Sequence, residues 1–290
     1  MAEEVITLVN QQSGKLAFKL CWFHDNSHFD HLQRNSHYSL IWVSHGSGKL
    51  KADFSEYLFE QNMLMAFSPY QPYMLSSDHV KGIAIHFHSD FFCIHKHQEE
   101  VTCNGVLFNN IYAAPFLIVD AVTAAKFKML TEQMKEEMQN ATAGQYEMLV
   151  SYLKILLITA SRLKIEQQPE AFPDRPAKDE RFILQKLKAA IEENFKTKHS
   201  PSDYATALNI SAKALAKITK SYFNKTLTEL ISERVIIEAK RELYLTNKTI
   251  KEIAYELGYD DEFYFSRFFK TNSEISPQMY RDTVGFGKSE

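Results

Sequence analysis

The last third of the chain repeats one pattern of apolar positions. In the first part of the repeat the spacing is 49 residues, and the matched pairs are Ala205 with Ala254, Leu208 with Leu257 and Ile210 with Tyr259. After one extra residue the spacing becomes 50, and the pairs are Leu215 with Phe265, Ile218 with Phe268, Thr219 with Phe269, Lys220 with Lys270, Thr226 with Ser276 and Leu230 with Tyr280. Each copy has the periodicity of a short helix, a tight turn and a second helix, which predicts two helix-turn-helix motifs.

The turn between the two helices of each copy carries suitable residues. The turns fall at Asn209-Ile210-Ser211 and Gly258-Tyr259-Asp260, where Asn and Gly tolerate the left-handed backbone conformation. We expect Ser211 and Asp260 to cap the second helices, which are predicted over 211–223 and 261–271.

Further helices are predicted before the repeat. Phe182–Phe195 is amphipathic, and Ser200-Pro201 opens the next helix with a capping residue and a proline at its first position. Residues 180–284 are therefore predicted to be helical almost throughout. Directly upstream, residues 167–179 contain three prolines within eight residues and no apolar periodicity, which predicts a linker.

The first part of the chain has the pattern of short strands. Within residues 18–94, Tyr38–Val43, Met63–Phe67 and Gly82–Phe87 are β-rich runs, and the turn segments His45–Lys49 and Ser68–Pro72 lie between them. Such strands predict a small antiparallel sandwich or barrel.

Two helices with apolar stripes are predicted after the strands. The stripes recur at steps of three and four residues and consist of Phe127, Leu130, Met134 and Met138, then Tyr146, Leu149, Val150, Leu153, Leu156, Leu157, Ala160 and Leu163. They are suited either to packing on the parent domain or to dimerisation, and the pattern alone leaves both open.

Composition excludes several classes of protein. The chain has 290 residues, of which 45% are hydrophobic and 24% charged, a balance typical of two folded domains. Its longest apolar runs are far shorter than the roughly 18 residues of a membrane span, and its N-terminus is acidic where a signal peptide is basic. We therefore expect a cytoplasmic protein with no membrane partner. Cys21, Cys93 and Cys103 have neither disulfide nor zinc spacing and are expected to be reduced thiols.

Charge is distributed unevenly along the chain. Residues 1–179 carry a net charge of −5, whereas residues 180–290 carry +2, and residues 196–251 hold 11 Lys and Arg against 5 Asp and Glu. This local excess indicates a surface that faces phosphates, although a solvated helical face also produces lysine runs.

The predicted second helices differ in their chemistry. Lys213, Lys217 and Lys220 share one face of the first, and no acidic residue occurs between Tyr204 and Thr228, which favours DNA over a plain solvated helix. Because lysine is a point-charge donor, this helix is expected to supply mainly phosphate affinity.

In the second helix, Tyr264, Phe265, Phe268 and Phe269 are expected to form the apolar side, with Glu262, Ser266 and Lys270 among the more exposed residues. Arg267 is the candidate for bidentate recognition of guanine. Phe263 is either a thymine-methyl contact or a packed aromatic residue. Acidic residues at the start of this helix repel phosphate, so most of the affinity is expected from the first copy.

The segments 250–259, 264–270 and 276–281 closely resemble the signature of the AraC/XylS-type (arabinose-regulator) transcription factors. The resemblance implies two DNA-binding helix-turn-helix units joined by a long helix, here Thr228–Leu245. It implies base-facing positions at Lys213, Ala216, Lys217, Glu262, Phe263 and Arg267, and it implies that Arg234 and Arg281 contact mainly the DNA backbone or support the fold. The full set of expected phosphate contacts is Lys220, Lys225, Arg234, Lys270 and Arg281.

The chain departs from this family where glycine usually follows each recognition helix. Asn224 and Glu274 stand there, and a left-handed Glu274 is expected to cost roughly 1 kcal/mol. Thr219 replaces the usual aromatic residue, so the core of the first unit is expected to be loosely filled.

The N-terminal half resembles the cupin-like sensor domain of the same family. Gln33, Asn35, Ser39 and Tyr73 fall where metal-binding cupins have their ligands, and these neutral side chains disfavour a metal. We expect His86 and His88 to be two half-buried histidines rather than metal ligands, and His24, His28, His31 and His37 to lie in loops.

Together these features predict an α+β protein that is no enzyme and needs no cofactor. Its predicted parts are a cupin-like β barrel (1–115), a helical dimerisation element (116–166), a linker (167–179) and an all-α double helix-turn-helix domain (180–284). The expected function is sequence-specific transcriptional regulation, as an activator, by a homodimer on double-stranded DNA. RNA polymerase is the expected partner, and a small-molecule effector is expected in the barrel. The alternatives are a metal-dependent cupin enzyme with a helical appendage and a non-specific nucleic-acid binder.

Overall fold

The computed structural model describes residues 4–10, 14–53, 55–101, 105–140, 143–167 and 178–284. The chain divides into two compact units. The first, called the sheet unit, comprises Met1–Asn110 and Ala114–Gln168, and the second, called the helical unit, comprises Ile111–Ala113 and Pro169–Glu290. In the described part of the chain no helix is long and apolar enough to cross a membrane.

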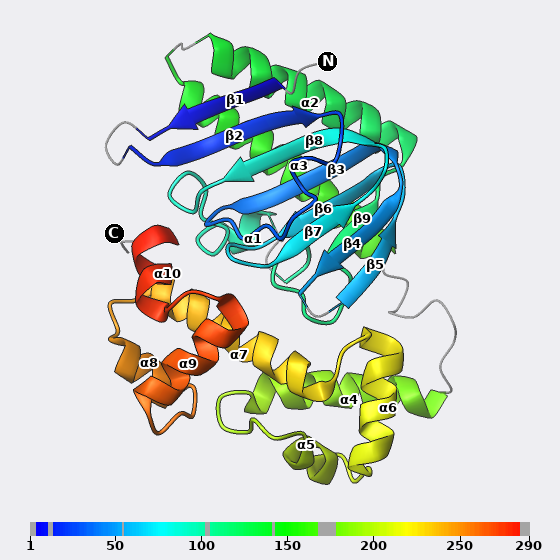
Figure 1. The fold of residues 1–290 in the computed structure, drawn as a ribbon, viewed down its shortest axis with the longest axis vertical. Helices are drawn as coiled ribbons and strands as arrows, with labels where there is room; N and C mark the ends of the chain where they lie inside the picture. The colour runs from blue at the N-terminus through cyan, green and yellow to red at the C-terminus, as the bar shows by residue number, and fades with distance from the viewer. Residues whose placement is uncertain are drawn as a thin grey trace. The chain divides into compact units, whose positions relative to one another are not determined.

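The sheet unit contains two antiparallel sheets (Figure 1). The six-stranded sheet has the order β1-β2-β8-β3-β6-β9, and its strands are β1 (Glu4–Val9), β2 (Leu16–Phe23), β8 (Val80–Phe87), β3 (Tyr38–Gly46), β6 (Met63–Phe67) and β9 (Phe116–Ile118). The three-stranded sheet has the order β5-β4-β7, with β5 (Ser55–Phe59), β4 (Gly48–Ala52) and β7 (Tyr73–Ser76). The three predicted strands are thus confirmed as β3, β6 and β8.

Side chains of the central strands alternate between two cores. On β3, Ile41 and Val43 point to the core that the two sheets share, which includes Leu50 of β4 and Leu75 of β7. Leu40, on the other face, points to the core formed with the helices. The sheet unit is therefore filled on both faces of its large sheet.

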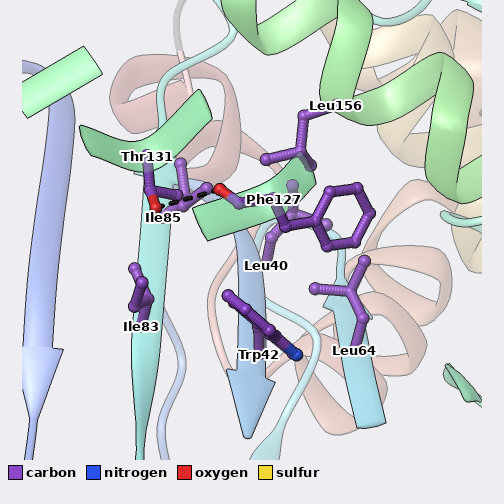
Figure 2. Close-up of a pocket in the computed structure, with 8 residues that line it drawn as sticks. All are labelled: Leu40, Trp42, Leu64, Ile83, Ile85, Phe127, Thr131 and Leu156. Carbon is purple, nitrogen blue, oxygen red and sulfur yellow. Dashed lines mark hydrogen bonds between the residues drawn. The ribbon is translucent and has the colours of Figure 1, made fainter. Parts of the chain in front are cut away.

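Two long helices, α2 (Ala121–Gln139) and α3 (Gln145–Gln167), cover the second face of the six-stranded sheet (Figure 1). Figure 2 shows a small apolar cavity at this contact, lined by residues of both layers: Leu40, Trp42, Leu64, Ile83, Ile85, Phe127, Thr131 and Leu156. Most of the predicted apolar stripe of α3 is buried here, so packing on the parent sheet accounts for it.

The strand before these helices belongs to the sheet. β9 pairs with β6 through Met63 opposite Ile118 and Met65 opposite Phe116, and α2 begins only at Ala121. A further helix, α1 (Gln98–Val101), precedes it. Cys21 and Cys93 are buried and form no disulfide within the described part of the chain, and Cys103 lies outside the described residues.

The helical unit follows the predicted pattern. Its helices are α4 (Lys178–Asn194), α5 (Pro201–Ala207), α6 (Ala212–Phe223), α7 (Leu227–Leu245), α8 (Ile250–Glu256), α9 (Glu262–Ser273) and α10 (Pro277–Val284). Ser200 caps α5 and Pro201 is its first residue, as predicted. The linker predicted over 167–179 lies mostly outside the described residues, and its two ends belong to α3 and α4.

Candidate nucleic-acid interface

Each helix-turn-helix turns at a left-handed residue. Asn209 has φ 52° and Gly258 has φ 78°. A Cβ atom at Gly258 would lie 2.1 Å from the carbonyl oxygen of Lys196, closer than any side chain tolerates. The predicted turn residues are thus confirmed, and the second turn requires glycine for space as well as for conformation.

The caps of the two recognition helices differ by one position. Ser211 caps α6, accepting a hydrogen bond from the Ala214 amide at 3.2 Å, as predicted. The cap of α9 is Asp261, which accepts from the Phe263 amide at 2.7 Å, so the prediction of Asp260 was wrong. The second turn is one residue longer, which explains why the repeat spacing changes from 49 to 50.

One face of α6 presents amines to solvent. Lys213, Ala216, Lys217 and Lys220 are exposed, while Leu215 and Thr219 are buried on the opposite face. Within the described residues Lys213 and Lys217 have no hydrogen bond or ion pair, and the Lys220 amine donates to the Asn224 carbonyl at 3.2 Å. The free amines are therefore available to an anionic partner.

Thr219 fills its position without leaving a polar group unpaired. Its side chain is fully buried, and its hydroxyl donates to the Ala216 carbonyl at 3.0 Å. This local bond satisfies the only polar atom of the side chain that replaces the family's usual aromatic ring.

The equivalent face of α9 carries a different set of side chains. Phe263, Arg267 and Lys270 are exposed, Glu262 is half-buried, and Phe265 is fully buried. Arg267 has no hydrogen bond or ion pair in the described part of the chain, so its guanidinium is free. In the repeat, Phe263 and Arg267 occupy the positions of Lys213 and Lys217.

Tyr264 departs from its prediction. It was expected on the apolar side of α9, but 58% of it is exposed, because the core of this motif is completed by Phe265, Phe269 and Tyr280. Tyr264 keeps a ring contact with Tyr259, with centroids 5.9 Å apart. Its exposure distinguishes it from the buried aromatic residues around it.

Lys225 does not present its charge to solvent. Its side chain is 6% exposed, and its amine lies 2.8 Å from Glu233, itself 10% exposed. A buried amine held by a carboxylate cannot also meet a phosphate without breaking a strong pair. The predicted phosphate contact at Lys225 is therefore corrected to a structural ion pair.

Arg234 also serves the fold. Its guanidinium is 2.7 Å from Glu192 of α4 and 3.1 Å from Glu238 of α7, and it lies 3.8 Å above the Phe195 ring. Burial alone would raise the pKa of Glu238, but the positive charges of Arg234 and Arg241 hold this pKa below its usual range. Of the two roles expected for Arg234, the geometry fits the structural one.

Arg281 ties the end of the second motif to α7. Its guanidinium donates to the carbonyls of Leu243 at 3.1 Å and Lys248 at 2.6 Å, and burial lowers its pKa. This guanidinium is occupied by the backbone, so its role also fits the structural alternative.

The helix α7 sets the separation of the two motifs. Its 19 residues correspond to about 28 Å of helix, the same order as the roughly 34 Å of one turn of duplex DNA. The capping box of Thr226 and Glu229 fixes where α7 starts, because each residue accepts from the backbone of the other.

The positions where metal-binding cupins have ligands do lie together in the sheet unit. The Asn35 amide donates to the Tyr73 hydroxyl at 3.2 Å, and the Ser39 hydroxyl is 2.8 Å from Nδ1 of His86. The backbone amide of Gln33 donates to the backbone carbonyl of Tyr73 at 2.8 Å. Burial raises the pKa of Tyr73 to about 12 and lowers that of His86 to about 3, so all these groups are neutral.

A neutral donor set of this kind suits a hydrogen-bonded core better than a divalent cation. Nowhere in the described residues do three His, Cys, Asp or Glu side chains gather closely enough to hold a metal. His86 and His88 are both buried, more deeply than the half-burial expected of them.

Comparison with known proteins identifies the helical unit. A family profile described as "Helix-turn-helix domain" matches residues 204–283. The HTH-type transcriptional activator AarP of Providencia stuartii is 30% identical over 99 residues, which are 34% of this chain and 73% of AarP. The chain belongs to the AraC/XylS family of transcriptional regulators. This is a family of transcription factors, not of enzymes.

Other proteins similar to this AraC/XylS chain either match a smaller share of their own length or have lower identity. The raffinose operon regulatory protein RafR of Pediococcus pentosaceus is 33% identical over 95 residues, so the match spans 33% of this chain and 34% of RafR. The structure of ToxT from Vibrio cholerae aligns with 97% of this chain and 98% of its own at 17% identity and a TM-score of 0.40. The chain thus spans about a third of the length of RafR.

Proposed function

We propose that this chain is a sequence-specific DNA-binding transcriptional regulator. The observation that carries the proposal is the pair of equivalent helix faces, one with Lys213 and Lys217 and the other with Phe263 and Arg267, exposed at the same positions of the repeat. A helix-turn-helix inserts such a face into the major groove. Two faces joined by α7 are suited to successive segments of one groove.

The proposed contacts divide by chemistry. The base-facing set is Lys213, Ala216, Lys217, Glu262, Phe263 and Arg267, and the phosphate set is reduced to Lys220 and Lys270, both exposed. Activation, through RNA polymerase, is proposed because AarP carries the name of an activator. The proposed site of action is the cytoplasm, where bacterial DNA is found.

We propose that α2 and α3 also form the homodimer contact. Their outward positions keep large apolar side chains, with Val122 82% exposed and Met129, Met148 and Ile155 all above 40%. On each helix these residues are seven apart, which places them on one face. Sedimentation of Ile155→Lys tests this role, since a monomer is expected where the unmodified chain forms a dimer.

The sheet unit is proposed to be a cupin-like barrel that senses a small molecule. Support comes from the core that the two sheets share and from Nε2 of His86, which is buried there with no hydrogen-bond partner. The proposed domains are the sensor over 1–115, the dimerisation element over 116–166, the linker over 167–179 and the DNA-binding domain over 180–284.

Selection from random duplex DNA tests the central proposal. The purified full chain is expected to enrich one sequence, and Arg267→Ala and Lys217→Ala are expected to weaken its binding. Lys126→Ala, an exposed lysine on α2, is the matched control and is expected to bind normally. Binding with steep salt dependence but no enriched sequence would favour the non-specific alternative. A tightly held Fe, Mn or Zn ion that requires His86 would favour the enzyme.

A further inference from the structure

Phe263 is a large apolar side chain left in solvent. It lies in the first turn of α9, and 70% of its surface is exposed. Among the described residues it has no aromatic contact, whereas the neighbouring Tyr264 contacts Tyr259. Packing therefore does not explain a phenylalanine at this position.

Phe263 and Arg267 are both exposed on α9. The two are four residues apart on one helix, so their Cβ atoms are about 5–6 Å apart on the same exposed face. Stacked base pairs are about 3.4 Å apart, so side chains at this separation contact base pairs that are adjacent or one apart.

The chemistry of the major groove gives each side chain one preferred target. The thymine C5 methyl is the apolar group that base edges present there, and the O6 and N7 acceptors of guanine match the guanidinium fork. We infer that the second helix-turn-helix recognises a thymine methyl with Phe263 and a guanine within two base pairs with Arg267.

This inference rests on the proposed function and assigns sequence discrimination to one motif. The first motif has Lys213 and Lys217 at the positions equivalent to Phe263 and Arg267, and a lysine offers a point charge rather than an apolar ring. A methyl contact that depends on Phe263 is therefore expected where α9 binds.

The test removes the methyl group from the DNA. A site selected by the full chain is resynthesised with deoxyuridine in place of each thymine, one position at a time, and Kd is measured. Loss of one buried methyl group is expected to weaken binding about fourfold at one position. A guanine is expected at most two base pairs from that position. Replacing its base pair is expected to weaken binding, and this loss is expected to depend on Arg267.

Protein variants show whether Phe263 makes the contact. Phe263→Ala is expected to weaken binding to the thymine site and to be insensitive to deoxyuridine at the critical position, while Phe263→Leu keeps most of the sensitivity. Tyr264→Ala, the exposed aromatic control, is expected to keep all of it. Because the deoxyuridine series also uses the unmodified protein, its result does not depend on the folding of any variant.

Three outcomes overturn the inference. In the first, every deoxyuridine site is bound with a Kd within about 1.5-fold of the unmodified site, which is roughly the limit of measurement. In the second, the effects of Phe263→Ala and of deoxyuridine on binding are independent of each other. In the third, the critical thymine lies more than two base pairs from any guanine whose contact depends on Arg267. If no sequence is selected at all, the proposed function itself fails. A selected sequence without methyl dependence refutes this inference alone.

Discussion

Replacing Lys164 with methionine is expected to stabilise the sheet unit at neutral pH. Lys164 lies on α3 with 4% of its surface exposed, and its amine donates to the Ala114 carbonyl at 2.9 Å. Burial lowers the pKa of this amine to about 8 from 10.5. At pH 7 the folded protein therefore holds a charged amine at a cost of about 3 kcal/mol.

Methionine keeps most of the side-chain volume and removes the charge, but it leaves the Ala114 carbonyl unpaired, which costs about 1 kcal/mol. The net gain expected at pH 7 is about 2 kcal/mol. Because the folded pKa lies below the unfolded one, the cost in the unmodified protein disappears as pH rises from 8 to 10.5. At pH values near and above 10.5 the order of stability is expected to reverse, and the unfolding free energy of the unmodified protein is expected to exceed that of Lys164→Met by about 1 kcal/mol.

Urea unfolding at several pH values measures this difference. The chain has two tryptophans, Trp22 and Trp42, and both lie in the sheet unit, so tryptophan fluorescence follows that unit in the full chain. Comparing the two proteins at each pH cancels the other groups that titrate. An equal difference in unfolding free energy at pH 7 and pH 10 would refute the reasoning.

Glu274 has φ 61°, so Glu274→Gly is expected to remove a strain of about 1 kcal/mol and raise the Tm of the helical unit by a few degrees, whereas Asn224→Gly leaves it nearly unchanged. Calorimetry of the full chain checks this, and an unchanged Tm for Glu274→Gly contradicts it. Lys220→Ala is expected to reduce the salt slope of DNA binding by about one, while Lys225→Ala lowers stability and leaves the slope unchanged, and equal slopes for both variants and the unmodified protein would count against the proposed phosphate contact. His86→Ala is expected to leave the metal content of the purified protein unchanged, and elemental analysis that shows the loss of one bound ion would reverse the conclusion on the donor set.

The helical unit follows from local signals in the sequence. Ser211 and Asn209 lie within three residues of each other and specify a turn and a cap by their own chemistry. The same signals misplaced the second cap, because two acidic residues stand side by side at Asp260 and Asp261 and only the path of the longer turn selects between them.

The sequence pattern did not predict which charged side chains are buried in ion pairs. Lys225 follows a lysine-rich helix and resembles its neighbours, but its partner Glu233 lies eight residues away on the next helix. Arg234 meets Glu192 across 42 residues. Such pairings depend on how helices pack, so a count of basic residues overstates the charge available to DNA.

Strands were predictable where they are continuous apolar runs. Met63–Phe67 is buried along its whole length and matches its predicted range. In contrast, β4 has the sequence GKLKA with lysines at alternate positions, and β9 has three residues that are strand only because β6 lies beside them. Neither carries a signal strong enough to stand out alone.

The exposed side chains of α6 differ from those of α9, so the two helix-turn-helix motifs are not interchangeable. With the contacts proposed above, a DNA segment that fits one protein molecule would have a lysine-contacted end and a phenylalanine-contacted end, so it would not be equivalent to its own reverse complement. Inverting that segment within a promoter would exchange its two ends. The bound protein would then be reversed on the DNA, and its surfaces would no longer face the same neighbouring sequences. On this proposal, the orientation of a site relative to the transcription start would be part of the regulatory signal.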